Sequence, residues 1–167
     1  VTCPFENREK DGNIMGKIYY VMGKSASGKD TIYKRLVKEL PELGTVRMYT
    51  TRPIRDGETN GVEYIFTDEK QLQAMTDAGK VIECRTYDTI YGPWSYFTAD
   101  DGQIDLGSGS YLMMGTLESY EKLCSYYGAE VMVPLYIHVE DGERLQRALN
   151  REKTQKVPKY AEMCRRF

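Results

Sequence analysis

The sequence predicts an α/β fold in which helices cover a parallel central sheet. Residues 17–22 (KIYYVM) form a short apolar and aromatic run that is typical of a buried strand. A glycine-bearing loop follows, and residues 30–40 then carry Ile32, Leu36 and Leu40 on one helical face until Pro41 ends the pattern. Because a strand, a loop and a helix in this order open a parallel α/β unit, they set the fold class.

The same alternation of short apolar runs and amphipathic segments continues along the chain. Further strands are predicted at 46–49, 62–66, 81–84, 111–114 and 131–139. Further helices are predicted at 68–78, 117–127, 142–151 and from 159 onward, with Asp68 near the N-cap of the first. Between 87 and 110 the periodicity fails, and we expect irregular structure there.

The bulk composition indicates one globular domain with a small inserted subdomain. The chain has 167 residues, of which 41% are hydrophobic and 29% charged, and its formal net charge is −2. This balance gives no reason to expect a nucleic-acid partner. No apolar run is long enough to span a bilayer and no signal-peptide pattern opens the sequence, so we expect no membrane association.

The cysteines and the first residues bear on location and boundaries. The four cysteines are widely scattered and form no CxxC pair, which favours free thiols in a reducing cytoplasm. We expect a cytoplasmic protein that is a monomer or a homodimer. Residues 1–16 are interpreted as an N-terminal extension or tag, because the stretch before Met15-Gly16-Lys17 is polar and aperiodic.

Residues 23–29 (GKSASGK) match the pattern G-x-x-x-x-G-K between the first strand and helix. Glycine tolerates the backbone conformations that let successive N–H groups curl around an anion, and the next helix points its positive end at that anion. The final lysine adds charge at the β and γ phosphates. The segment predicts a P-loop that binds ATP, in a P-loop NTPase fold. The residues assigned to ATP are Gly23, Lys24, Ser25, Ala26, Ser27, Gly28, Lys29, Asp30 and Thr31.

The residue after the P-loop lysine departs from the strict motif. A serine or threonine hydroxyl usually meets Mg²⁺ there, whereas this chain has Asp30 followed by Thr31. A carboxylate suits this hard cation, so Asp30 can ligate it directly or through water. Thr31 can instead hydrogen-bond the α-phosphate. We expect Mg²⁺ as cofactor, with Asp30 and Thr31 as candidate ligands.

A second anion site is indicated by two arginines three residues apart. Arg52 and Arg55 open a loop at 52–61 that is rich in proline, glycine and charge. Because the arginine fork matches phosphate oxygens, the pair can hold one phosphate from two sides. The alternative is a solvated surface loop. Together with the P-loop, a second phosphate site favours a phosphotransferase.

At this point the sequence resembles guanylate kinase. The resemblance rests on the P-loop, the run TTRPIRDGETNGVEYIF, the segment GKVIE, a later Tyr-Gly pair and an arginine-rich end, which occur in that order over most of residues 17–167. It implies a three-layer α/β/α P-loop fold with a small inserted α+β subdomain and a lid. The implied divisions are a core at 17–51 and 98–167, an acceptor subdomain at 52–97 and a lid near 147–160.

The resemblance also implies site residues for an acceptor. Arg52, Arg55 and Tyr64 would hold the phosphate of GMP, and Tyr91 would touch the same phosphate. Glu83 would accept hydrogen bonds from the guanine N1–H and 2-amino group, an edge that presents two donors. The implied activity is phosphoryl transfer from ATP to GMP, which gives ADP and GDP.

The arginines near the end of the chain resemble those of the family's lid. Arg147 and Arg151 would close over the transferring phosphoryl group, and Arg166 would join them from the next helix. The residues to which the resemblance gives a catalytic role are Lys29, Arg52, Arg147, Arg151 and Arg166.

The sequence departs from the family's pattern around the base. The family commonly has an Asp-x-Asp pair where residues 112–116 read LMMGT, and a polar residue where this chain has Met48. The GKD of the P-loop and Gly115-Thr116 also resemble ribose 1,5-bisphosphate phosphokinase, a sugar-phosphate kinase of the same fold. Glu83 and the run TTRPIR favour the guanylate kinase side. A non-catalytic guanylate-kinase-like module that binds proteins is the third alternative, although such modules characteristically lose the P-loop.

Overall fold

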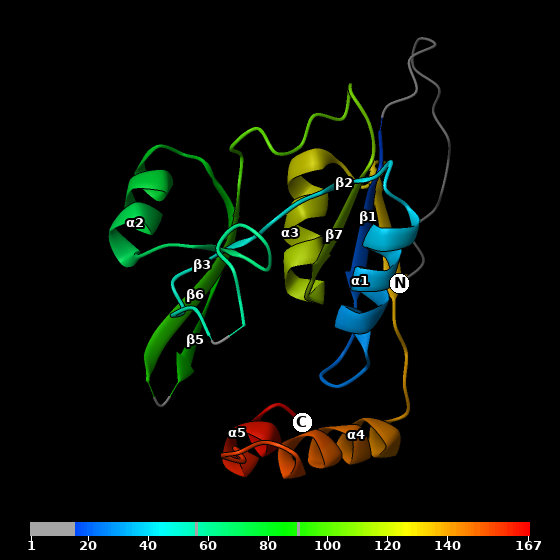
Figure 1. Cartoon of the computed structure of the whole chain (residues 1–167). Helices are drawn as coiled ribbons and strands as arrows, with labels where there is room; N and C mark the ends of the chain where they lie inside the picture. Colours follow the sequence, from blue (N-terminus) through cyan, green and yellow to red (C-terminus); the bar gives the residue numbers. More distant parts are fainter. Residues whose placement is uncertain (1–15, 56, 90) are drawn as a thin grey trace.

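The computed structural model describes residues 16–55, 57–89 and 91–167, in two sheets and five helices. Sheet A is parallel, with the strand order β2-β7-β1-β8 (Figure 1). Its strands are β1 (Ile18–Met22), β2 (Gly44–Thr45), β7 (Tyr111–Gly115) and β8 (Met132–Tyr136). The predicted residues 1–15 of the N-terminal extension lie outside the described part.

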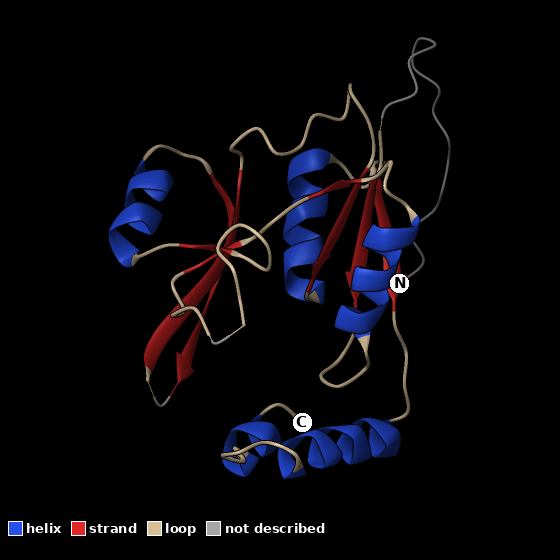
Figure 2. Ribbon diagram, in the orientation of Figure 1, coloured by secondary structure: helices blue, strands red, loops and turns tan. Residues whose placement is uncertain are grey.

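Two crossover helices place sheet A in a three-layer arrangement. The helix α1 (Lys29–Glu39) leads from β1 to β2, and α3 (Leu117–Tyr127) leads from β7 to β8 in the opposite direction across the sheet. Since such crossovers are right-handed, opposite directions put the two helices on opposite faces. Figure 2 shows them flanking the strands, which agrees with the predicted α/β/α class.

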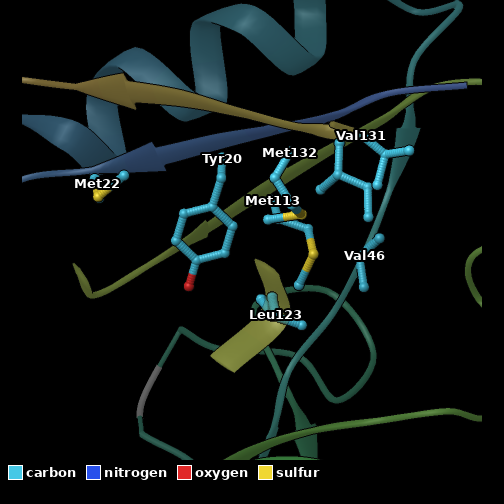
Figure 3. Packing of buried hydrophobic residues seen from close by; sticks show 8 residues of the cluster. Tyr20, Met22, Val46, Met113, Leu123, Val131 and Met132 are labelled. Atoms are coloured by element: carbon cyan, nitrogen blue, oxygen red, sulfur yellow. The ribbon is translucent and has the colours of Figure 1, made fainter. Parts of the chain in front are cut away.

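The core of this layer system lies between sheet A and α3. Tyr20, Met113, Leu123 and Met132 are at most 1% exposed and pack together (Figure 3). On the other face, α1 has no fully buried residue, and Ile32 of its predicted apolar face is 36% exposed. The α3 side of the sheet therefore supplies most of the apolar burial that stabilises this part.

Sheet B is a separate, mixed sheet with the order β4-β3-β6-β5. Its strands are β3 (Tyr49–Thr50), β4 (Ile65–Phe66), β5 (Val81–Thr89) and β6 (Gly92–Ala99), and α2 (Glu69–Asp77) packs on it. As expected, α2 begins after the N-cap Asp68, whose carboxylate accepts from Gln71 N. The strands of sheet B start at Tyr49 and end at Ala99, so they include residues that the predicted division gave to the core.

The expectation of irregular structure between 87 and 110 is wrong for its first part. The strands β5 and β6 pair antiparallel from Val81 opposite Ala99 to Thr89 opposite Gly92. On β6 the buried positions include Ser95 and Thr98 besides Phe97, while Trp94 and Tyr96 are half-buried. Because both faces mix polar and apolar residues, the alternation that signals a strand is lost.

The chain leaves β8 and ends in a pair of helices below the sheets in Figures 1 and 2. These are α4 (Asp141–Lys153) and α5 (Tyr160–Arg165), which contact each other. Among residues 16–55, 57–89 and 91–167, none of the helices combines the length and apolar character needed to cross a bilayer.

Candidate functional site

The P-loop is a tight turn between β1 and α1. Gly28 is the N-cap of α1 with φ 87°, and Ala26 also has a positive φ of 58°. A Cβ on Gly23 would lie 2.7 Å from Ser27 Oγ and 2.8 Å from Ile137 O, so only glycine fits there. The predicted loop therefore adopts the curled backbone that exposes N–H groups at a helix N-terminus.

The lysine of this loop is paired with its neighbour. Lys29 Nζ donates to Asp30 Oδ1 at 2.6 Å, and the Asp30 side chain is 68% exposed. An ammonium group has three N–H donors, so this contact leaves two for phosphate oxygens. Thr31 is exposed on the first turn of α1.

A cleft of about 920 Å³ joins the P-loop, sheet B and the C-terminal helix. The predicted site residues that line it are Ser25, Lys29, Asp30, Arg52, Arg55, Tyr64 and Arg166. Its eight lysine and arginine residues outnumber its four acidic ones. The chain thus brings both predicted phosphate sites to one basic cleft, as binding of polyphosphate requires.

Arg52 is held rigidly at the floor of this cleft. Its side chain is 3% exposed, and its Nη1 and Nη2 donate to both carboxylate oxygens of Glu58 at 2.9 and 2.8 Å. Its guanidinium also faces the rings of Tyr64 and Phe66 at 5.6 and 5.3 Å. Hydrogen bonds from Arg52 hold the pKa of the Glu58 carboxyl below its usual value. The pair is preorganised, and Arg52 stays charged.

One atom of Arg52 has no partner. Its Nε is buried and makes no hydrogen bond among the described residues. An unpaired buried donor costs about 1–3 kcal/mol, more when it is charged. Arg55 lines the same cleft, and its backbone N donates to Glu58 Oε2 at 2.8 Å.

Glu83 is placed differently from its implied role. Its side chain is fully buried and does not line the cleft. Both its oxygens are engaged, by Arg85 Nε at 2.9 Å and Nη2 at 3.3 Å, and by Thr98 Oγ1 at 2.8 Å. The residue that reaches the cleft from this part of β5 is Arg85. Contact between Glu83 and guanine stays a prediction.

Tyr91 lies outside the cleft, at the tip of the β5–β6 hairpin. It is 64% exposed and stacks on Trp94 with ring centroids 5.9 Å apart. The ammonium of Lys159, between α4 and α5, lies 5.6 Å from the Tyr91 ring centroid. The hairpin tip therefore contacts the predicted lid region, while Tyr87, Trp94 and Tyr96 line the cleft.

The helix α4 is fastened to the P-loop by arginines. Arg144, which is 5% exposed as a side chain, donates to Ser25 O at 2.9 Å and to Asp141 Oδ1 at 2.6 Å. Arg147 Nη1 lies 3.5 Å from Ser27 O. Arg151 is half exposed beside Glu152 and does not line the cleft. Of the two predicted lid arginines on α4, Arg147 thus lies at the P-loop and Arg151 does not.

The helix α5 presents two arginines to the cleft. Arg165 donates to Glu162 through Nε at 2.9 Å, and Arg166 donates to the same carboxylate at 3.0 Å. These contacts, with the Arg165 hydrogen bond largest, lower the pKa of Glu162 to about 2. Both cations are therefore kept at the cleft by one carboxylate that remains charged.

Several site residues were missed by the sequence reasoning. Glu58 lies within the run TTRPIRDGETNGVEYIF, six residues after Arg52. A search for a carboxylate that pairs with this arginine could have found it. Arg85 shares a strand face with Glu83, because residues two apart on a strand point the same way. Arg144 precedes Arg147 by one helical turn. For Trp94 the sequence left open a place beside the acceptor pocket or in the packing of the small subdomain, and the residue lines the cleft; nothing in the local sequence indicates that Tyr96 does.

Comparison with known proteins locates the similarity in the first half of the chain. Residues 15–95 match the family model described as guanylate kinase. The guanylate kinase of Legionella pneumophila (strain Lens) is 37% identical over 78 residues, which are 46% of this chain and 37% of that protein. The guanylate kinase of Coxiella burnetii is 38% identical over 76 residues, or 45% and 37% of the two chains. The resemblance to guanylate kinase is confirmed.

The fold is shared over a longer stretch. The crystal structure of guanylate kinase from Anaplasma phagocytophilum matches with a TM-score of 0.63 at 22% identity, and covers 83% of this chain and 69% of that one. This match shows the predicted P-loop α/β architecture. The sequence alignments cover little more than a third of the curated relatives' own length.

Proposed function

We propose that this chain transfers a phosphoryl group from ATP to GMP. The observation that carries the proposal is the single cleft that holds Lys29 of the P-loop and the pair Arg52 and Arg55. A donor phosphate at the P-loop and an acceptor phosphate at the arginines would therefore lie in the same cleft, where they could meet. The similarity of residues 15–95 to guanylate kinases supports the choice of acceptor.

The chemistry needs positioning more than covalent help. The acceptor phosphate is itself an anionic nucleophile, so no general base is required. Lys29 and the loop amides would hold the donor, while Arg52, kept in place by Glu58, would offer its positive charge to the acceptor phosphate. Alignment of the two bound phosphates and neutralisation of their charge would supply most of the rate enhancement.

The arginines of α4 and α5 would neutralise charge on the transferring group. Arg166 and Arg165 already line the cleft, and Arg147 lies at the P-loop. Arg151 would need movement of α4 to reach the reacting phosphates. An arginine supplied to such a transition state is worth about 10³–10⁵ in rate.

The residues at the P-loop suit a magnesium ion bound together with ATP. Asp30 offers an exposed carboxylate beside Lys29 in the cleft, and Thr31 offers a hydroxyl on the next residue. Protein sites for Mg²⁺ commonly use one or two carboxylates, with waters and substrate phosphates as the other ligands. When bound, the ion would offset charge on the β and γ phosphates.

A coupled assay of ADP release from ATP tests the proposal. Turnover is expected with GMP, and Lys29→Ala is expected to lower kcat by about 10³ or more, since a charge at the transferred phosphoryl is lost. Arg35→Met, on the exposed side of α1, is the matched control and should keep full activity. Turnover with ribose 1,5-bisphosphate but not GMP would overturn the acceptor. Absence of turnover with every acceptor would leave a binding function.

A further inference from the structure

A buried polar network beside the cleft is formed by Glu83, Arg85 and Thr116. Arg85 is 6% exposed and lies on β5, yet it reaches the cleft. Its Nη1 donates to Thr116 Oγ1 at 2.8 Å, at the start of α3, and its Nε and Nη2 donate to Glu83. The carboxylate that could accept hydrogen bonds from a base is thereby occupied, and it does not line the cleft.

The donors of Arg85 are not exhausted by these contacts. A guanidinium has five N–H groups. Two are directed at Glu83 and one at Thr116, while Nη2 is 3.5 Å from the sulfur of Met48, a weak acceptor. Among the described residues, Nη1 makes no other hydrogen bond than the one to Thr116. One N–H of Nη1 is therefore free for a ligand, and the second N–H of Nη2 is held only by the weak sulfur acceptor of Met48.

The position of Arg85 relative to the phosphate site suits the far end of a nucleotide. Tyr96 pairs with Arg85 across the β5–β6 ladder, and the same tyrosine interacts with the guanidinium of Arg52. Tyr87, Trp94 and Tyr96 also line the cleft and offer aromatic faces to a base. An acceptor phosphate at Arg52 would thus have its base directed along these aromatic residues.

The charge balance favours a neutral group rather than a second phosphate at Arg85. Its positive charge is matched by Glu83, which is fully buried and accepts from Arg85 and Thr98. A phosphate dianion there would meet a carboxylate at close range in a medium of low dielectric constant. Neutral acceptor atoms meet no such penalty. An arginine fork matches the O6 and N7 acceptors of guanine, whereas adenine presents one acceptor and one donor on that edge.

We propose that Arg85 selects the acceptor base by donating to guanine O6 and N7, with Glu83 as the residue that positions Arg85. This inference rests on the proposed function. It differs from a direct contact of Glu83 with N1–H and the 2-amino group in the edge of the base that is recognised. The two arrangements predict opposite responses to changes at those edges.

Three other nucleoside monophosphates, compared with GMP on the unmodified full chain, distinguish recognition by Arg85 from recognition by Glu83. IMP lacks the 2-amino group but keeps O6 and N7, and its kcat/KM is expected within about threefold of that for GMP. The monophosphate of 7-deazaguanosine keeps N1–H and the 2-amino group but lacks N7, and AMP replaces O6 by a donor. Their kcat/KM values are expected to be on the order of 10- to 100-fold lower. A loss with IMP but not with the 7-deaza analogue would overturn the inference.

Variants of the pair provide the second test. Arg85→Met is expected to lower kcat/KM for GMP and IMP by the same factor and to abolish discrimination against AMP, with Arg35→Met as control. Because Arg85→Met leaves Glu83 unpaired, the double variant with Glu83→Gln is measured beside it. Retained discrimination in a folded double variant would overturn the inference while turnover with GMP upholds the proposed function. No turnover of the unmodified chain with any nucleotide would overturn both.

Discussion

At the scale of single residues, close contacts around Gly115 restrict which residue can occupy that position in the cleft. Gly115 ends β7 and lines the cleft, and a Cβ there would lie 2.0 Å from Tyr20 Oη. Tyr20 is fully buried and shares a hydrogen bond with Ser119 Oγ. Burial raises the pKa of Tyr20 to about 12, so its hydroxyl stays protonated at neutral pH. The glycine is thus required by the tyrosine behind it.

Gly115→Ala is expected to destabilise the fold by about 1–3 kcal/mol, because the added methyl group displaces the buried Tyr20 ring. Thermal unfolding followed by circular dichroism measures the effect. Gly142→Ala on α4 is the matched control, since a Cβ there meets no atom within 4 Å. The control is expected to stabilise the helix by about 0.5–1 kcal/mol. Equal melting temperatures for Gly115→Ala and the parent would contradict this account.

At the scale of elements, the two terminal helices depend on single arginines and carboxylates. The buried Arg144 ties α4 to the P-loop through Ser25 O and packs 4.9 Å from the ring centroid of Phe167. Glu162 holds both arginines of α5 at the cleft. The contact of Arg144 with Ser25 joins the P-loop to a helix 119 positions later in the chain.

Arg144→Met is expected to lower stability by about 1–3 kcal/mol, because Ser25 O and Asp141 lose a buried donor. The KM for ATP is expected to rise with it, since the P-loop loses its support from α4. Denaturant unfolding and steady-state kinetics measure the two effects. Arg35→Met removes only an exposed pair with Glu39 and should change neither. An unchanged KM in Arg144→Met would show that α4 does not support the loop.

The pKa of the Glu162 carboxyl group is expected to be about 2 instead of the ordinary glutamate value of 4.5, because Arg165 and Arg166 donate to it. Because the folded-state pKa is lowered, the pairing stabilises α5 above the unfolded-state pKa and is lost as the pH falls toward 2. A carbon-detected NMR titration of the side-chain carboxyl measures this directly. Arg165→Met should move the midpoint upward. A midpoint near 4.5 in the parent chain would contradict the pairing.

At the scale of the whole molecule, residues of the P-loop, of sheet B and of the C-terminal helix line one cleft, and contacts between α3 and β5 join sheet B to sheet A. One of these contacts is made by Thr116, whose Oγ1 caps α3 by accepting from Ser119 N at 3.4 Å and also accepts from Arg85 on β5. Since β5 belongs to sheet B and α3 covers sheet A, this hydroxyl connects the two halves. The position of the P-loop relative to Arg52 and Arg55 depends on contacts of this kind between the two sheets.

Thr116→Val is expected to cost about 1–2 kcal/mol, since both the cap and the link to Arg85 are lost. Trp94, the single tryptophan, lies in sheet B and reports its unfolding by fluorescence. Its urea transition should move ahead of the transition seen by circular dichroism. The control is Thr76→Val, whose hydroxyl bonds only within α2. Coincident transitions at the parent midpoint in Thr116→Val would contradict the link.

The elements that depend on residues close together in the chain could be predicted from the sequence alone. Glycine geometry, helical spacing and capping residues predict the P-loop, α1, α2 and α3, because each uses residues close together in the chain. The run at 50–66 and the arginine pair likewise carried the resemblance that the comparisons confirm. The strand segments at 87–89 and 92–99 escaped, since β6 mixes polar and aromatic residues on both faces. The predicted strand at 46–49 is wrong for residues 46–48, which connect β2 to β3.

The partners of the charged residues, in contrast, depend on the tertiary structure and could not be predicted from the sequence. Glu83 and Arg85 are both visible in the sequence, yet their mutual burial depends on Thr98 across the ladder and on Thr116 at the start of α3. The same holds for Arg144 and Ser25, which are 119 positions apart. Such pairings follow from desolvation and long-range packing, which no local pattern encodes. They make the P-loop part of a cleft that Arg85 of sheet B also lines.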